Sequence, residues 1–222
     1  MDNLYFFAIY FMIKSLITIG LYPILFYGLT CIKPQLNYKN KIYVVSNLIK
    51  GGMLFYLGIT YFSRLFSIFN QNDWDSFIYK KITVAYAVTD FCSLFIVNKM
   101  KLNTIIHHIL VVLFAIIIVY SDIEYNTILY SIIVYGFFSS IAYMVNIFLA
   151  LRFVVSLRVQ KILCNIAYYM YVFGCCINWM YQLQFICINI FTNTINIIIY
   201  TTAISFLIYD DFLLLKFLKN NK

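Results

Sequence analysis

The chain has 222 residues, of which 64% are hydrophobic and only 11% are charged, and its mean hydropathy is +0.89. Too few polar residues are present to cover a soluble domain of this length, so a soluble globular fold is excluded. The formal net charge of +8 comes from basic residues in short turns between apolar stretches. That distribution indicates membrane topology and contact with anionic headgroups, and it argues against nucleic-acid binding.

Seven apolar stretches are long enough to cross a membrane as helices, since about 20 residues span a hydrocarbon core about 30 Å thick. They cover about 4–31, 43–69, 82–98, 104–120, 127–151, 162–182 and 190–209. The first contains Lys14 and Pro23, and we expect a kink or a tilt there. The second contains Lys50 before two glycines, and we expect this lysine to extend to the nearer membrane surface. The sequence therefore predicts an all-α integral membrane protein with about seven transmembrane helices.

The basic residues of the turns alternate between the two sides of this predicted bundle. The turns after the first, third and fifth spans and the C-terminal tail contain eleven: Lys33, Lys39, Lys41, Lys99, Lys101, Arg152, Arg158, Lys161, Lys216, Lys219 and Lys222. The opposite turns contain only Lys80 and Lys81, together with four acidic residues. The positive-inside rule then predicts an N-terminus outside and a C-terminus in the cytosol. We expect an endomembrane such as the endoplasmic reticulum, or a host membrane if the source is viral.

Three of the spans carry polar residues at helical spacing. The sets are Thr83, Tyr86, Asp90 and Ser93 in the third span, Ser131, Tyr135, Ser139 and Asn146 in the fifth, and Asn189, Asn193 and Asn196 in the seventh. Because residues three and four apart share a helix face, each set should face a cavity or another helix. The residues that we expect to line a lipid cavity are Tyr86, Ser93, Ser131, Tyr135, Ser139 and Asn146. The alternative is that they form hydrogen bonds between packed helices, worth about 0.6–2 kcal/mol each.

The candidate catalytic residues are Asp90 in the third span and the adjacent His107 and His108 in the fourth. Ionisable groups at membrane depth are costly, and they are functional candidates by default. Counted from the turn between these spans, the carboxylate and the imidazoles differ by about 6 Å in depth, so a direct or water-mediated contact is expected. Such a contact would hold one imidazole in a single tautomer and raise its basicity. The alternative is that the histidines are polar residues tolerated near the membrane interface.

A metal centre is not expected at this site. Adjacent residues on a helix diverge by about 100°, so His107 and His108 cannot both face one atom. The six cysteines form no CxxC pair and lie mostly in apolar runs, so neither a zinc site nor structural disulfides are expected. Asp210 and Asp211 follow the seventh span on the same side as the histidines and could add charge to their vestibule. We interpret them instead as solvated residues at the end of a helix.

The run YAVTDFCSLFIVNKMKLNTIIHHIL resembles the core of the TLC family, the membrane domain of ceramide synthases and their relatives. Tyr86, Asp90 and the histidine pair stand where that family has its tyrosine, aspartate and double histidine. The upstream run YKNKIYVVSNLIKGG is similar to the first helix of the family's domain, with Ser46 retained. The resemblance implies three parts: a leading helix (1–32), a TLC-type membrane domain with a six-helix barrel (38–215) and a short basic cytosolic tail (216–222).

The resemblance implies that the barrel binds a membrane lipid, such as a sphingoid base, a ceramide or a fatty acyl chain, and influences membrane lipid composition or sensing. The alternative it implies is an acyl-CoA-dependent N-acyltransferase, with one histidine as general base or acyl carrier, Asp90 orienting it and acyl-CoA as the co-substrate. Ceramide synthases carry two aspartates in the following helix, and the span at 127–151 has no acidic residue. A third hypothesis is a proton or solute pathway through Asp90 and a histidine. No cofactor is expected, and a homo-oligomer is compatible with this composition.

Overall fold

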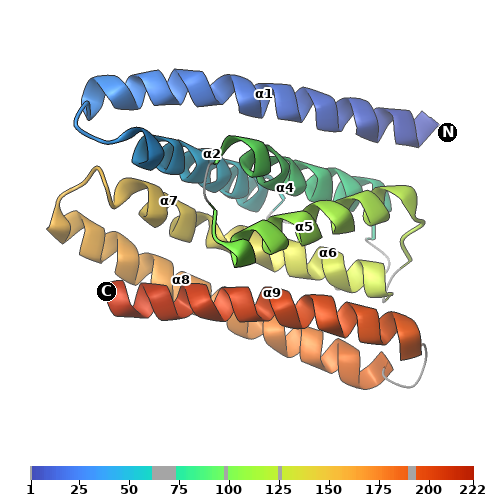
Figure 1. Ribbon diagram of the computed structural model, residues 1–222. Coiled ribbons are helices and arrows are strands. Elements are labelled where there is room, and N and C mark those ends of the chain that lie inside the picture. The colour runs from blue at the N-terminus through green and yellow to red at the C-terminus, as the bar shows by residue number, and fades with distance from the viewer. Residues whose placement is uncertain (1, 62–73, 98–99, 125–126, 190–193) are drawn as a thin grey trace.

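The computed structural model describes residues 2–61, 74–97, 100–124, 127–189 and 194–222, and most of these residues are helical (Figure 1). The helices are α1 (Asp2–Ile32), α2 (Tyr38–Thr60), α4 (Ser76–Ile96), α5 (Leu102–Tyr120), α6 (Ile128–Ser139), α7 (Tyr143–Leu151), α8 (Leu157–Asn189) and α9 (Thr194–Asn221), with the short 3-10 helix η2 (Ser140–Ala142) between α6 and α7. Three predicted features lie outside the described residues: the end of the second span at 62–69, Lys99 and Asn193. The helix α1 continues through Pro23.

Three helices begin at side chains that cap their first turn. Asn37 Oδ1 accepts a hydrogen bond from the backbone N–H of Asn40 at the start of α2. The Asp75 carboxylate accepts two from the first turn of α4, and the Thr127 hydroxyl accepts one from the first turn of α6. Such caps satisfy backbone donors that have no partner within the helix. Both α2 and α4 therefore begin earlier than the hydropathy alone predicted.

The last two helices are also longer than the apolar stretches that predicted them. The helix α8 includes Asn189, whereas Asn196 lies exposed on α9, so these residues do not share the helix face that was predicted for them. Because α9 continues to Asn221, Asp210 and Asp211 lie inside this helix and not at its end. Our interpretation of the two aspartates as solvated helix-end residues is wrong, and their contacts are described with the site.

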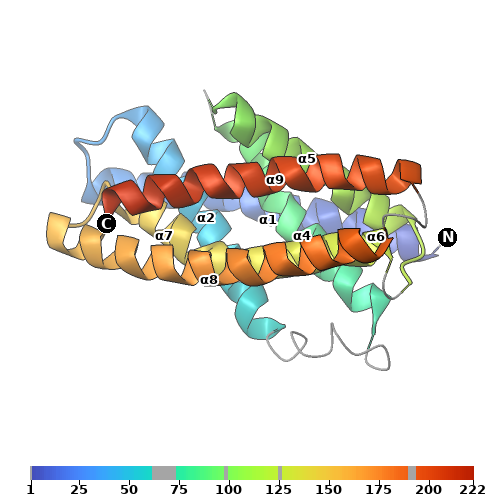
Figure 2. The ribbon, with the colours of Figure 1, turned by 90° about the horizontal axis from the view of Figure 1, so that it is seen from below.

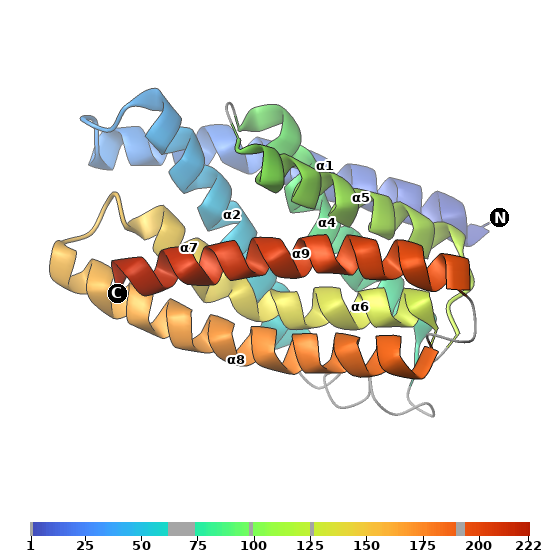
Figure 3. The same ribbon diagram turned by 60° about the horizontal axis from the view of Figure 1, so that its bottom comes forward.

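The helices form a closed ring with α1 on its outside. Around the ring, α2 packs on α4, α4 on α5, α5 on α9, α9 on α8, α8 on both α6 and α7, and α7 on α2 (Figures 2 and 3). The helix α1 lies against α2 and α4 (Figure 1). The two termini lie at opposite ends of the bundle, as an odd number of crossings requires (Figure 1). The predicted arrangement of a leading helix and a ring of six spans is confirmed.

The outer surface of this bundle is apolar. Within the described residues, six helical segments are long and apolar enough to cross a membrane, and the seventh, α4, has a similar length but carries Lys80, Lys81 and Asp90. Large hydrophobic side chains are exposed on the outer helices: Ile13, Leu16 and Ile24 on α1, Leu113 and Ile116 on α5, Met180 and Leu183 on α8, and Ile198 and Ile199 on α9. A surface of this kind is stable in lipid and would aggregate in water. The chain is a multi-pass membrane protein.

A 3-10 turn interrupts the fifth span halfway along its length. Ser139 Oγ donates to the backbone carbonyl of Tyr135, and Ser140 Oγ donates to that of Phe137. Serine hydroxyls that bond to the preceding turn compete with the helical ladder and bend a helix. The segment from Ser140 to Ala142 therefore forms η2, and Ala142 of this turn lines the cavity described below.

The helices α2 and α7 approach each other closely at Gly51 of α2. A methyl group added there would lie 3.2 Å from Ile147 Cγ1 and 3.3 Å from Asn146 Cβ of α7, whereas one added at Gly52 would meet no atom within 4 Å. We therefore expect Gly51→Leu to lower the free energy of unfolding by about 1–3 kcal/mol through overpacking. Gly52→Leu is the matched control. Thermal unfolding of both variants in the same detergent measures the effect, and equal midpoints would contradict this packing.

Candidate functional site

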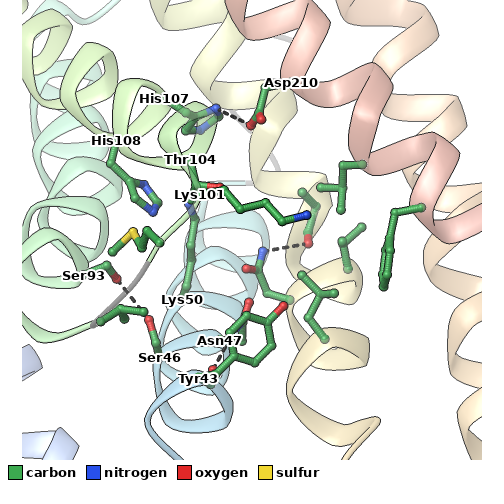
Figure 4. A pocket seen from close by; sticks show the side chains of 18 of the residues that line it. Tyr43, Ser46, Asn47, Lys50, Ser93, Lys101, Thr104, His107, His108 and Asp210 are labelled. Carbon is green, nitrogen blue, oxygen red and sulfur yellow. Dashed lines mark hydrogen bonds and ion pairs between the residues drawn. The ribbon is translucent and has the colours of Figure 1, made fainter. Parts of the chain in front are cut away.

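A cavity of about 620 Å³ opens at one end of the ring, within the size range of small-molecule sites. Its walls come from α2 as far as Leu54, the second half of α4, the first turns of α5, the region of η2 and α7, Tyr171 of α8 and residues 210–217 of α9 (Figure 4). The turns between α1 and α2 and between α7 and α8, the end of α4 and the start of α5 all lie at this end. Apolar side chains such as Leu54, Val145 and Leu149 share the walls with charged ones, so the cavity suits an amphipathic ligand.

Asp90 is completely buried beside this cavity and contacts two basic side chains. Lys50 Nζ lies 2.5 Å from Asp90 Oδ1, and His108 Nδ1 lies 2.8 Å from the same oxygen. The lysine forms a hydrogen bond, whereas the imidazole makes a close ion-pair contact whose N–H is not well aligned on the oxygen. The other carboxylate oxygen, Oδ2, has no hydrogen-bond partner among the described residues. The expected direct contact between Asp90 and a histidine is therefore present, and it is made by His108.

Lys50 was not predicted to take part in the site. We expected its ammonium group to extend to the membrane surface, and this was wrong, because it turns inward to the carboxylate of α4 and lies 5.9 Å from the centre of the Tyr86 ring. An isolated charge at this depth would have to be neutralised or paired, and a partner on the next helix satisfies both groups. The signal was present in the sequence, since Asp90 also needed a partner of opposite charge.

His107 faces a different acidic residue. Its Nδ1 lies 3.1 Å from Asp210 Oδ2 of α9, and its ring is perpendicular to that of His108 with the ring centres 5.8 Å apart (Figure 4). This divergence is the one expected for neighbouring residues of a helix. Both imidazoles line the cavity, and each is paired with its own carboxylate. A carboxylate on one ring nitrogen leaves the other nitrogen as the group that can accept a proton from a ligand.

Asp211 is buried and accepts hydrogen bonds from three aromatic side chains. Tyr135 and Tyr171 each donate their hydroxyl to it at 2.6 Å, and the Trp179 indole N–H donates at 3.4 Å. These donors come from α6 and α8, so the carboxylate joins three helices. This network was not predicted, because the last apolar stretch of the sequence ends before the two aspartates.

The polar residues of the third and fifth spans divide into two groups. Tyr86, Ser93, Ser139 and Asn146 line the cavity. Ser131 and Tyr135 lie outside its lining and join helices instead. Ser131 is hydrogen-bonded to Gln182 of α8 and to Tyr200 of α9, and Gln182 and Tyr200 also bond to each other. For these two residues the alternative of helix-joining hydrogen bonds is the one observed. Ser93 also approaches Ser46 of α2, with 3.1 Å between their hydroxyl oxygens.

No protein-family profile, curated protein or solved structure matches this chain. Within the described residues, no group of three or more histidine, cysteine or acidic side chains could hold a metal ion.

We expect the Lys50–Asp90 contact to stabilise the fold. Lys50→Met would leave the Asp90 carboxylate buried with only the poorly aligned imidazole, and we expect it to lower the free energy of unfolding by about 3–5 kcal/mol. The double variant Lys50→Met/Asp90→Leu removes both charges and should lose less than the sum of the two single losses. Thermal unfolding in detergent checks both expectations. Lys161→Met, at an exposed position of α8, is the control, and an equal loss there would contradict the proposed role.

Proposed function

We propose that this protein binds a membrane lipid in its cavity and thereby influences membrane lipid composition or sensing. The observation that carries the proposal is a cavity with apolar walls and paired charges inside a ring of membrane-spanning helices. An acyl chain can contact the apolar walls while a polar headgroup reaches the histidines and the charged opening. The likeness of residues 86–110 to the TLC family supports the same function, because the residues that carry it are those beside the cavity.

We also propose that the open end of the cavity faces the cytosol. By the sequence, eleven basic residues lie in or beside the turns predicted for this side and in the C-terminal tail, against two on the other side. The positive-inside rule favours this orientation, with the N-terminus on the lumenal or extracellular side. A ligand would then reach the site from the cytosolic leaflet or from the cytosol.

Lipid binding can be tested by obstructing the cavity. Thr104 of α5 lines it, and Thr104→Phe would place a ring among the residues of Figure 4. We expect this variant to retain several-fold less co-purified lipid than the wild type, as measured by native mass spectrometry. Thr202→Phe, at an exposed position of α9, is the matched control and should retain wild-type amounts. Equal lipid content in the two variants would refute binding at this site.

A second candidate function is N-acyl transfer from acyl-CoA. It is favoured by the pairing of His107 with Asp210 at the wall of the cavity, because a carboxylate orients an imidazole for general-base catalysis. In this reaction the imidazole accepts a proton from an amine as its nitrogen attacks the thioester carbonyl, and the CoA thiolate leaves. His108 would then have a structural role, because its contact with Asp90 holds this part of the cavity wall in place.

We expect any acyl transfer to depend on His107. Purified protein is incubated with labelled long-chain acyl-CoA and a sphingoid base, and the amide product is measured. His107→Ala should lower the rate by about 10²–10⁴-fold, the usual contribution of a general base. Asp210→Asn should lower it less and keep KM for acyl-CoA. Wild-type protein that binds lipid but forms no amide would refute acyl transfer and leave lipid binding standing.

A further inference from the structure

Arg152, which follows α7 at the opening of the cavity, is held between aromatic rings. Its guanidinium carbon lies 4.7 Å from the centre of the Phe153 ring, 5.1 Å from that of Phe217 and 5.3 Å from that of Tyr43. The three aromatic residues lie on separate parts of the bundle: Tyr43 on α2, Phe153 in the α7–α8 turn and Phe217 on α9. Stacking on aromatic faces fixes the plane of a guanidinium group, and it leaves the edge with its N–H donors as the part that can bind a ligand.

Arg152 has an unused hydrogen-bond donor. Its Nε is buried and has no hydrogen-bond partner among the described residues. A buried donor without an acceptor is unfavourable, so an oxygen atom of a ligand at this edge would satisfy it. Arginine presents its donors as a planar fork, a geometry that matches two oxygens of a phosphate group.

Two further cations lie in the walls of the same cavity without a carboxylate partner. Lys39 lies in the first turn of α2 and Lys101 precedes α5. No described carboxylate oxygen lies within 4.0 Å of either lysine or of Arg152. Figure 4 shows the Lys101 side chain extending into the cavity. The carboxylates at the cavity are already engaged, Asp210 by His107 and Asp211 by the hydroxyl groups of two tyrosines. The opening therefore carries positive charge that no described acidic group compensates.

We infer that Arg152, with Lys39 and Lys101, binds a phosphate group of the ligand at the opening of the cavity. The phosphate belongs either to a lipid headgroup or to a soluble phosphorylated molecule, and both present the same tetrahedral anion. This inference deepens the proposed lipid binding and rests on it, since the phosphate site is the polar end of that cavity. The apolar part of the ligand then lies toward Leu54 and Val145, deeper between the helices.

The test compares two fluorescent probes with the same acyl chain, a monoacylglycerol phosphate and a monoacylglycerol, on protein in phosphatidylcholine nanodiscs. Wild type should bind the phosphorylated probe at least tenfold more tightly, a difference of about 1.4 kcal/mol. Arg152→Gln should abolish this preference while the variant still binds monoacylglycerol, and Arg152→Lys should keep part of the preference. Arg158→Gln, at an exposed position of α8, is the matched control and should keep the full preference.

Added pyrophosphate distinguishes the two sources of the phosphate. Displacement of the phosphorylated probe by pyrophosphate indicates a site for soluble phosphates, whereas a preference that survives pyrophosphate indicates a lipid headgroup. Equal binding of both probes by the wild type would overturn the phosphate site while the lipid cavity stands, and binding of neither would overturn the proposed function itself. If Arg152→Gln loses monoacylglycerol binding as well, this variant has lost its fold. The wild type and Arg152→Lys then decide the result. Equal affinity of either protein for the two probes overturns the phosphate site.

Discussion

The carboxylate of Asp90 imposes the main constraint on this structure. It is buried completely inside a bundle whose exterior is apolar, and a lone charge there would be far too costly to keep. Lys50 of α2 and His108 of α5 both approach its Oδ1, so this one oxygen joins three of the six spans of the ring. The two basic groups therefore hold α2, α4 and α5 together at the depth where the cavity begins.

On the far side of the cavity, two adjacent acidic residues of α9 hold the helices together. Asp210 contacts His107, and the neighbouring Asp211 accepts the hydroxyl groups of Tyr135 and Tyr171. Adjacent residues of α9 thus bond in different directions, one to α5 across the cavity and the other to α6 and α8. The cavity lies between these two charged clusters, so its polar groups are positioned by contacts that also close the ring.

The sequence by itself determined the class of fold and the contact of Asp90 with one of the two histidines. Its hydropathy predicted seven membrane-length helices, and helical geometry predicted that one histidine would meet Asp90 while the other diverged from it, as His107 does toward Asp210. These features follow from local rules: the length of a helix in lipid, and the rise and rotation of each residue. The limits of the helices were less predictable, because capping side chains and tertiary contacts extended them beyond the apolar stretches.

Only the tertiary structure decided which side chains share the site. Lys50 was expected to reach the membrane surface, and Ser131 was expected beside the cavity, yet the lysine turns to Asp90 and the serine joins α6 to α8 and α9. Arg152 looked like one basic turn residue among eleven until the rings of Tyr43 and Phe217 were placed beside it. Spacing along one helix shows that residues share a face, but the partner of that face depends on how separate helices pack, and no local pattern specifies that.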